Sequence, residues 1–206
     1  MIRYSLPKAL LYVTYIFILA GCKGTHASDQ VKEETWHMTD GITQQLPGRE
    51  EEEAFRQAAL DGNVERVKML LKQGVECNVA DEDGRTALML ASFNGHSEII
   101  LELINEGAEI DRRDYKDQTA LLYGASGPFP ETIRILLENG ADPNIMDSQE
   151  HFTPLMTAAA EGHLEVVKLL IQFGADRNLM DVDGDDAGTF AAQNGHIQVA
   201  KYLKQE

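Results

Sequence analysis

Pairs of aliphatic residues return along this chain at a spacing of about 33 residues. Each pair lies in a short amphipathic stretch, which favours a helix with one buried side. A glycine closely follows every pair, and glycine commonly ends a helix because it takes a left-handed backbone without strain. The pairs and their glycines are Leu70-Leu71 with Gly74, Leu103-Ile104 with Gly107, Leu136-Leu137 with Gly140, and Leu170-Ile171 with Gly174. The pattern predicts a series of short, regularly spaced helices.

A second set of markers keeps step with these pairs. A threonine motif occurs as Thr86-Ala87-Leu88, Thr119-Ala120-Leu121 and Thr153-Pro154-Leu155, and a glycine–histidine motif as Gly95-His96, Gly162-His163 and Gly195-His196. Threonine is a good N-cap and proline suits the first turn, so the threonine motif predicts the start of another helix. The glycine–histidine motif then falls between two helices, where glycine accepts a positive φ. Each unit is therefore predicted to hold two short antiparallel helices.

These motifs recur in phase over most of the chain, and in this the sequence resembles the ankyrin repeat family. The resemblance implies an all-α fold, a solenoid of about five helix-turn-helix units with hairpin-like loops. A single unit cannot bury its apolar face, so the stacking of neighbouring units supplies the core. The repeat domain is expected to span 49–206, with units at 49–80, 81–113, 114–146, 147–180 and 181–206.

Three places depart from the repeat pattern. The third unit has Gly127-Pro128-Phe129-Pro130 in place of glycine and histidine, so the turn between its helices must differ. The segment 147–153 holds one residue more than its counterparts, and we expect this loop to bulge. In the last unit Asp186 stands where threonine is expected, which predicts a weakened first helical turn.

The N-terminus has the anatomy of a secretory signal. Arg3 and Lys8 precede an uncharged apolar run over 9–20. This run is too short to cross a membrane as a helix, which needs roughly 20 residues. A basic start followed by a short apolar stretch and small residues is typical of a cleaved signal peptide.

The apolar run ends in Leu19-Ala20-Gly21-Cys22, which resembles the lipobox of bacterial lipoproteins. The resemblance implies a signal peptide over 1–21 and acyl chains on Cys22 that anchor the protein in a membrane. Lys23 follows where aspartate would typically retain a lipoprotein at the inner membrane. We therefore expect the outer membrane, with the chain facing the periplasm.

Residues 22–48 are expected to form the lipidated cysteine and a flexible tether. The segment 23–48 has no sustained periodicity and is rich in Thr, Gln, Glu, Lys and Gly. Trp36, the only tryptophan, and Met38 interrupt this polarity. A short docking segment around these two residues is the alternative to a linker.

The charge balance excludes several classes of partner. The chain of 206 residues has 34 acidic and 18 basic side chains, and its net charge is −16. This argues against nucleic acid, because phosphate contacts need clustered Lys and Arg. Two cysteines are too few for a disulfide framework or a cysteine-rich zinc domain. The acidic excess favours a protein partner with a basic face, held toward the C-terminal half of the loop edge, where the acids are most concentrated.

The side chains that could carry catalysis or bind metal either have a structural explanation or form no recognisable site. The repeat accounts for three histidines, whose rings are expected to hydrogen-bond a neighbouring backbone: His96, His163 and His196. The others are scattered without ligand spacing: His26, His37 and His151. The acidic segment 181–186 lacks the glycine and glutamate positions of an EF-hand, and Cys77 is expected to pack as a small hydrophobe. We therefore predict no enzyme activity, no cofactor and no metal site.

Recognition of another protein is the function that remains. The resemblance implies that loop tips and the first helix of each unit contact the partner. The loop candidates are Glu82, Asp83, Arg85, Tyr115, Lys116, Gln118, Gln149, Glu150, Phe152, Val182, Asp183 and Asp185. The helix candidates are Phe93, Tyr123 and Ser126. Aromatic side chains beside acids suit a binding hot spot, because they bury much area at a low entropic cost.

Together, the patterns predict a lipid-anchored ankyrin solenoid in the bacterial periplasm that binds another protein. In this design it resembles immunity proteins that sequester antibacterial effectors, including secreted phospholipases. An acidic inhibitor is drawn toward a basic toxin face, which favours this role. The alternative that the sequence leaves open is an accessory role in periplasmic oxidative-stress defence, associated with catalase.

Overall fold

The computed structural model describes residues 48–204, which fold into paired helices without a β-strand. The ten helices of this part are α2 (Arg49–Leu60), α3 (Val64–Lys72), α4 (Ala87–Phe93), α5 (Ser97–Asn105), α6 (Ala120–Ala125), α7 (Pro130–Glu138), α8 (Pro154–Glu161), α9 (Leu164–Gln172), α10 (Ala187–Gln193) and α11 (Ile197–Leu203). The all-α prediction is confirmed. The predicted signal peptide, Cys22 and the predicted tether up to residue 47, with Trp36, lie outside the described residues.

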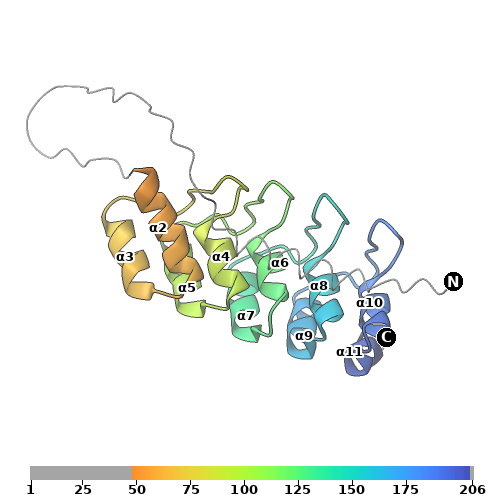
Figure 1. Ribbon diagram of the computed structural model, residues 1–206. Helices are drawn as coiled ribbons and strands as arrows, with labels where there is room; N and C mark the ends of the chain where they lie inside the picture. The colour runs from red at the N-terminus through yellow and green to blue at the C-terminus, as the bar shows by residue number, and fades with distance from the viewer. Residues whose placement is uncertain (1–47, 205–206) are drawn as a thin grey trace, which may run out of the picture. The chain divides into compact units, whose positions relative to one another are not determined.

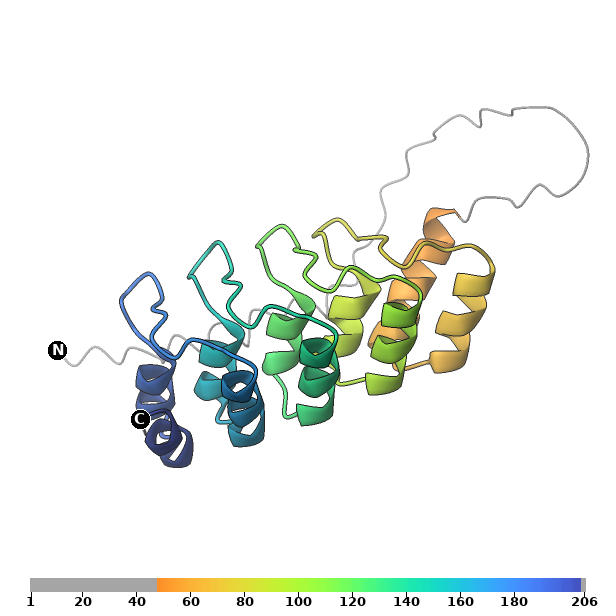
Figure 2. The same ribbon diagram turned by 180° about the vertical axis from the view of Figure 1, so that it is seen from behind.

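The helices form two rows that follow the stack from one pair to the next (Figure 1). The first helices of the pairs, α2, α4, α6, α8 and α10, pack against one another in one row. The second helices, α3, α5, α7, α9 and α11, form the other row. Hairpin-like loops project on one side of the rows, and Figure 2 shows them from behind. We call their ends the first to fourth loop tips, at 81–85, 114–118, 147–152 and 181–185.

Threonine begins the first helix of the three middle pairs, as the motif predicts. The hydroxyls of Thr86, Thr119 and Thr153 accept hydrogen bonds from backbone N–H groups at 3.4, 3.4 and 3.2 Å. In the last pair Asp186 takes this place, and its Oδ1 accepts a 2.7 Å hydrogen bond from the backbone N–H of Thr189. Because aspartate caps a helix as well as threonine does, the expectation of a weakened first turn in α10 is wrong.

Glycine ends the second helices of the first four pairs, as predicted. Their φ values are 94°, 86°, 96° and 90° at Gly74, Gly107, Gly140 and Gly174. The residue after each glycine donates back into the last turn; the N–H of Val75, for example, lies 3.1 Å from the carbonyl oxygen of Leu70. This closure directs the chain out of the helix and toward the next loop.

Histidine rings connect the turns of neighbouring pairs. His96 Nε2 lies 3.0 Å from the carbonyl oxygen of Leu60. His163 Nε2 lies 3.2 Å from the carbonyl oxygen of Ser126. Both contacts cross from one pair to the preceding one, which confirms the structural role expected of these two side chains.

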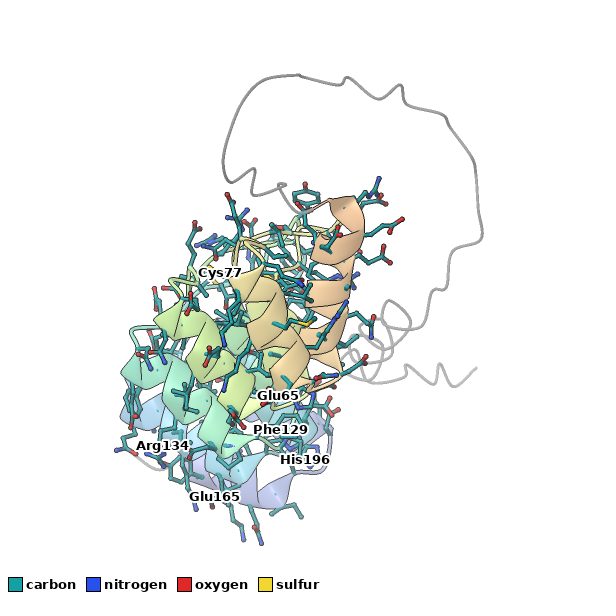
Figure 3. The ribbon with its side chains drawn as sticks, turned by 90° about the vertical axis from the view of Figure 1, so that its left-hand side faces the viewer. Glu65, Cys77, Phe129, Arg134, Glu165 and His196 are labelled. Atoms are coloured by element: carbon teal, nitrogen blue, oxygen red, sulfur yellow. The ribbon has the colours of Figure 1, made fainter. Side chains whose placement is uncertain are left out.

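The third pair uses Phe129 where the others have histidine. Its ring covers Gly95 of the preceding pair, where an added β-carbon would lie 2.9 Å from Cδ2. Pro128 fills the place that Gly95 has in the second pair, and proline cannot adopt a positive φ, so the turn differs as expected. Figure 3 shows Phe129 and His196 toward the turn end of the stack and Cys77 toward the loop end.

The core lies between the rows and is made of the aliphatic pairs and their neighbours. The first residue of each pair, Leu70, Leu103, Leu136 and Leu170, has no exposed surface. Full burial of a leucine contributes about 1.5–3 kcal/mol, so these repeated positions stabilise the stack. The core holds the loops at fixed positions along one edge.

Candidate protein-binding surface

Each loop tip is built around an aspartate that binds the backbone of its own loop. Asp81 Oδ1 accepts hydrogen bonds from the N–H groups of Asp83 and Arg85 at 3.0 and 2.8 Å. Asp114 and Asp181 accept from the same relative positions in their tips. Such side-chain-to-backbone bonds stabilise a turn, so the tips keep a defined shape.

The third tip accommodates its extra residue by shifting these hydrogen bonds. Asp147 Oδ1 accepts from the N–H groups of Glu150 and Phe152 at 3.0 and 3.2 Å, each one residue farther along than in the other tips. His151 adopts a φ of 61° within the lengthened tip. The predicted bulge is therefore present, and it leaves Gln149 and Glu150 exposed at the end of the loop.

Backbone hydrogen bonds join each tip to the next. The N–H of Tyr115 lies 3.0 Å from the carbonyl oxygen of Asp83, and the N–H of Ser148 lies 2.9 Å from that of Lys116. A third bond of 3.1 Å joins the N–H of Val182 to the carbonyl oxygen of Glu150. The four tips thus form one connected edge.

The predicted contact residues divide into three groups by exposure. The exposed ones are Glu82, Asp83, Tyr115, Gln149, Glu150, Val182 and Asp183. The half-buried ones are Arg85, Phe93, Lys116, Ser126 and Asp185. The buried ones are Gln118, Tyr123 and Phe152, at 3%, 6% and 4% exposure. The surface that a partner can reach directly is carried by the first two groups.

Tyr123 is a buried residue that contacts the second tip from inside the protein. Its hydroxyl donates a 2.9 Å hydrogen bond to Asp114 Oδ2, and its ring meets that of Phe93 edge-on at 6.4 Å between centroids. Burial raises the pKa of Asp114, while the hydrogen bonds from Gln118 and Lys116 oppose this shift. Burial and the charge of Asp114 raise the pKa of Tyr123, so it stays a hydrogen-bond donor. Tyr123 therefore supports the second tip.

Phe152 supports the last two tips in a similar way. Its ring packs against Phe190 of α10, with 5.0 Å between centroids. Phe152 is also the residue whose N–H and carbonyl close the third tip onto Asp147. Its side chain joins neighbouring pairs beneath the edge, which accounts for an aromatic residue at this position.

Charges on the first two tips are paired with opposite charges. Arg85 lies 2.8 Å from Asp81 Oδ2 and 3.3 Å from Asp83 Oδ2. Burial lowers the pKa of Arg85, but the hydrogen bond and charge of Asp81 outweigh it, and the net shift is upward. Arg113 lies 3.6 Å from Asp117, and Arg49 pairs with Glu82.

Acids dominate the third and fourth tips. These two tips contain five acidic residues and no lysine or arginine. Glu150 and Asp183 are exposed there beside Val182, which is 51% exposed. Met180, two residues before Val182, is also exposed, at 57%, and it was not among the predicted contact residues because it precedes the tip. The sequence did contain a signal for Met180, because it is an apolar residue within a polar loop.

The described part of the chain has one cysteine and no cluster of metal-ligating side chains. Between 48 and 204, no three His, Cys, Asp or Glu side chains are grouped to hold a metal ion. Cys77 is half-buried beside an open hollow of about 400 Å³, and its thiol donates to the Glu106 carbonyl at 3.3 Å. Burial raises the pKa of this thiol, which disfavours the reactive thiolate. None of the helices in 48–204 has the length and apolar character needed to cross a membrane.

The stacked helix pairs and the connected loop edge define a helical repeat protein of the class that binds other proteins. The family profile described as ankyrin repeats (3 copies) matches residues 55–147 and 129–206. The chain belongs to the ankyrin repeat family. No curated protein matches the chain.

Proposed function

We propose that this protein is a membrane-anchored periplasmic immunity protein that binds and neutralises an antibacterial effector such as a secreted phospholipase. The observation that carries the proposal is the loop edge, whose exposed apolar and acidic side chains are set on a rigid base. Members of the ankyrin family generally bind other proteins, which supports a role in recognition rather than catalysis.

The charge distribution supports a partner with a basic face. The third and fourth tips contain five acidic residues and no lysine or arginine, whereas ion pairs at the first two tips link Arg85 to Asp81 and Asp83, and Arg113 to Asp117. A basic face on the partner would complement the acidic excess of the third and fourth tips. Complementary charge accelerates the encounter and selects the orientation of the complex.

The anchor completes the proposal. The Leu19-Ala20-Gly21-Cys22 motif supports acylation of Cys22 and attachment to the outer membrane. Attachment would keep the binding domain in the periplasm, where an effector delivered by a competing cell arrives. A tether over 23–48 would let the loop edge reach an effector at the membrane surface.

The test is co-purification and protection. An effector encoded beside this protein is expressed in the periplasm of sensitive cells, with and without the full chain. We expect the chain to co-purify with the effector and to restore growth. If neither binding nor protection is seen, while deletion lowers peroxide resistance, the role in oxidative-stress defence replaces this proposal.

Two variants separate the parts of the proposal. Cys22→Ser removes the acylation site and is expected to release the protein from the membrane fraction while binding in solution persists. Glu150→Gln with Asp183→Asn changes the loop edge and is expected to weaken binding while membrane attachment persists. A Cys22→Ser chain that stays in the membrane would contradict the anchor alone.

A further inference from the structure

Tyr115 is the most exposed large hydrophobic side chain of the described residues, with 78% of its surface accessible. Its ring nevertheless has a fixed support. A β-carbon added to Gly84 would lie 3.0 Å from Tyr115 Cδ1, so the ring lies against the backbone of the first tip. Gly84 itself is buried and has a φ of 84°.

The backbone beneath the ring is held as well. The N–H of Tyr115 donates to the carbonyl oxygen of Asp83 at 3.0 Å, which joins the second tip to the first at this point. The ring therefore lies near Gly84 at Cδ1, while 78% of the residue's surface stays open to solvent. An aromatic side chain that is already ordered loses little entropy when a ligand covers it.

The surroundings of the ring favour a cationic ligand. The first tip has three acidic residues and one arginine. The carbonyl oxygen of Asp83 accepts the Tyr115 N–H, and the carboxylate of the same residue is 54% exposed although it also lies 3.3 Å from Arg85. The open face of a tyrosine ring attracts cations through its quadrupole, and a nearby carboxylate adds to this attraction.

We infer that the open face of Tyr115, with Asp83 beside it, is a subsite for one arginine or lysine side chain of the protein partner. The inference rests on the proposed function, because it names the group of a basic partner that the first two tips receive. The side chain would stack on the ring and direct its charge toward the carboxylate of Asp83, which it would share with Arg85. Guanidinium suits the site better than ammonium because it is planar and more weakly hydrated.

The test uses N-acetyl-arginine amide as the probe and N-acetyl-citrulline amide, its uncharged counterpart, as the control. Each is titrated into the full chain, labelled with ¹⁵N and held in detergent micelles, while backbone amide shifts are recorded. We expect saturable shifts at Tyr115 and Gly84 with the arginine probe and much smaller ones with citrulline. Equal shifts with both probes would overturn the inference.

Substitutions of the exposed residues identify the groups responsible. Tyr115→Ala is expected to weaken arginine binding about two- to fivefold, whereas Tyr115→Phe keeps the ring and most of the affinity. Asp83→Asn is expected to weaken binding about twofold. Because Tyr115 is exposed, none of its variants is expected to disturb the fold. An unchanged affinity in Tyr115→Ala would reject the subsite.

A matched control distinguishes this site from the acids elsewhere on the edge. The Glu150→Gln and Asp183→Asn double variant lowers the charge of the distant tips but leaves the Tyr115 subsite intact, so the shifts at Tyr115 should persist. Loss of the shifts in this variant would assign the binding to the distant tips instead. If a partner co-purifies but the arginine probe causes no shift at Tyr115, the subsite is refuted and the proposed function is retained.

Discussion

The imidazole ring of His196 lies directly on Gly162 of the preceding helix pair. A β-carbon added to Gly162 would be 2.7 Å from both Cε1 and Cγ of this ring. Gly162 also has a φ of 77°, because it ends α8 in a left-handed turn. Glycine is thus required here for two reasons, the backbone conformation and the space that the ring occupies.

The first prediction separates these two reasons by comparing Gly162→Ala with Gly195→Ala. Gly195 has a similar φ of 80°, but an added β-carbon would meet no atom within 4 Å. Gly195→Ala should therefore cost only the left-handed strain, about 1–2 kcal/mol of unfolding free energy. Gly162→Ala should cost about 1–3 kcal/mol more because of overpacking against the ring. Urea unfolding monitored by circular dichroism measures both values.

Removing the ring provides the control for this comparison. In a His196→Ala background, the extra cost of Gly162→Ala should disappear, which a double-mutant cycle reports as a coupling energy. Equal destabilisation by the two glycine substitutions in the wild-type chain would contradict the contact between His196 and Gly162.

The second prediction concerns His163 and pH. Burial lowers the pKa of His163; the hydrogen bond to the Ser126 carbonyl opposes this shift, and the charge of His196 adds to it. As pH falls below about 6.5, the unfolded chain therefore takes up the proton before the folded chain does. The contribution of neutral His163 to the unfolding free energy is complete above this pH, and it is lost as pH falls through the lower pKa of the folded state.

Replacing His163 by glutamine tests this directly. The unfolding free energy of the wild type is expected to fall between pH 7.5 and 5.5, and His163→Gln should show a smaller fall because the side chain no longer titrates. Groups that titrate elsewhere are shared by both proteins, so the difference between the two slopes reports His163. Parallel slopes would rule out the contribution of this residue.

The third prediction concerns the strained backbone of the second tip. Asp117 has a φ of 60°, at the position that Gly84 and Gly184 occupy in the first and fourth tips. Asp117→Gly should raise the unfolding free energy by about 0.5–1 kcal/mol, since it removes the left-handed strain. Its ion pair with Arg113 is exposed, and losing it should matter little.

Thermal unfolding measures this gain, which corresponds to an increase of roughly 1–4 °C in Tm for a domain of this size. Asp117→Ala is the matched control, because it removes the carboxylate but keeps the strained β-carbon. If Asp117→Ala is as stable as Asp117→Gly, the carboxylate and not the backbone was the destabilising element.

The fold was largely predictable because the repeated threonine and glycine positions mark many of the helix boundaries by a local chemical signal. Thr86 and Gly74 mark a helix start and a helix end through their own hydrogen-bonding and backbone properties, independently of the rest of the chain. Asp186 shows the limit of a motif that is matched by residue type. It departs from the threonine pattern but performs the same capping, because the hydrogen bond needs only a side-chain oxygen at that position.

The candidate surface was less predictable because exposure depends on neighbouring repeats. Tyr115 and Tyr123 are both aromatic residues of the same unit, yet one is 78% exposed and the other 6% exposed. The difference arises because α6 buries Tyr123 against Phe93 of α4, whereas Tyr115 lies on a glycine at the tip. A single sequence locates the repeat but does not show which side chains the adjacent loop covers.

The last prediction concerns the rate at which a basic partner binds. Glu150→Gln with Asp183→Asn removes two exposed acids from tips that contain no lysine or arginine. We expect the association rate constant to fall severalfold at low salt, with a smaller change in dissociation, because exposed charges mainly steer the encounter.

The matched control is Glu65→Gln with Glu138→Gln, which removes two exposed acids from α3 and α7, away from the tips. This control changes the net charge by the same amount as the tip variant. A comparable fall of the association rate constant in both variants would therefore show a nonspecific effect of total charge. Raising the salt concentration should slow the wild type toward the rate of the tip variant, because the Debye length shrinks from about 10 Å at 0.1 M to about 3 Å at 1 M. Stopped-flow measurements at both salt concentrations decide the question, and a salt-insensitive rate for the wild type would show that the acidic tips do not guide the partner.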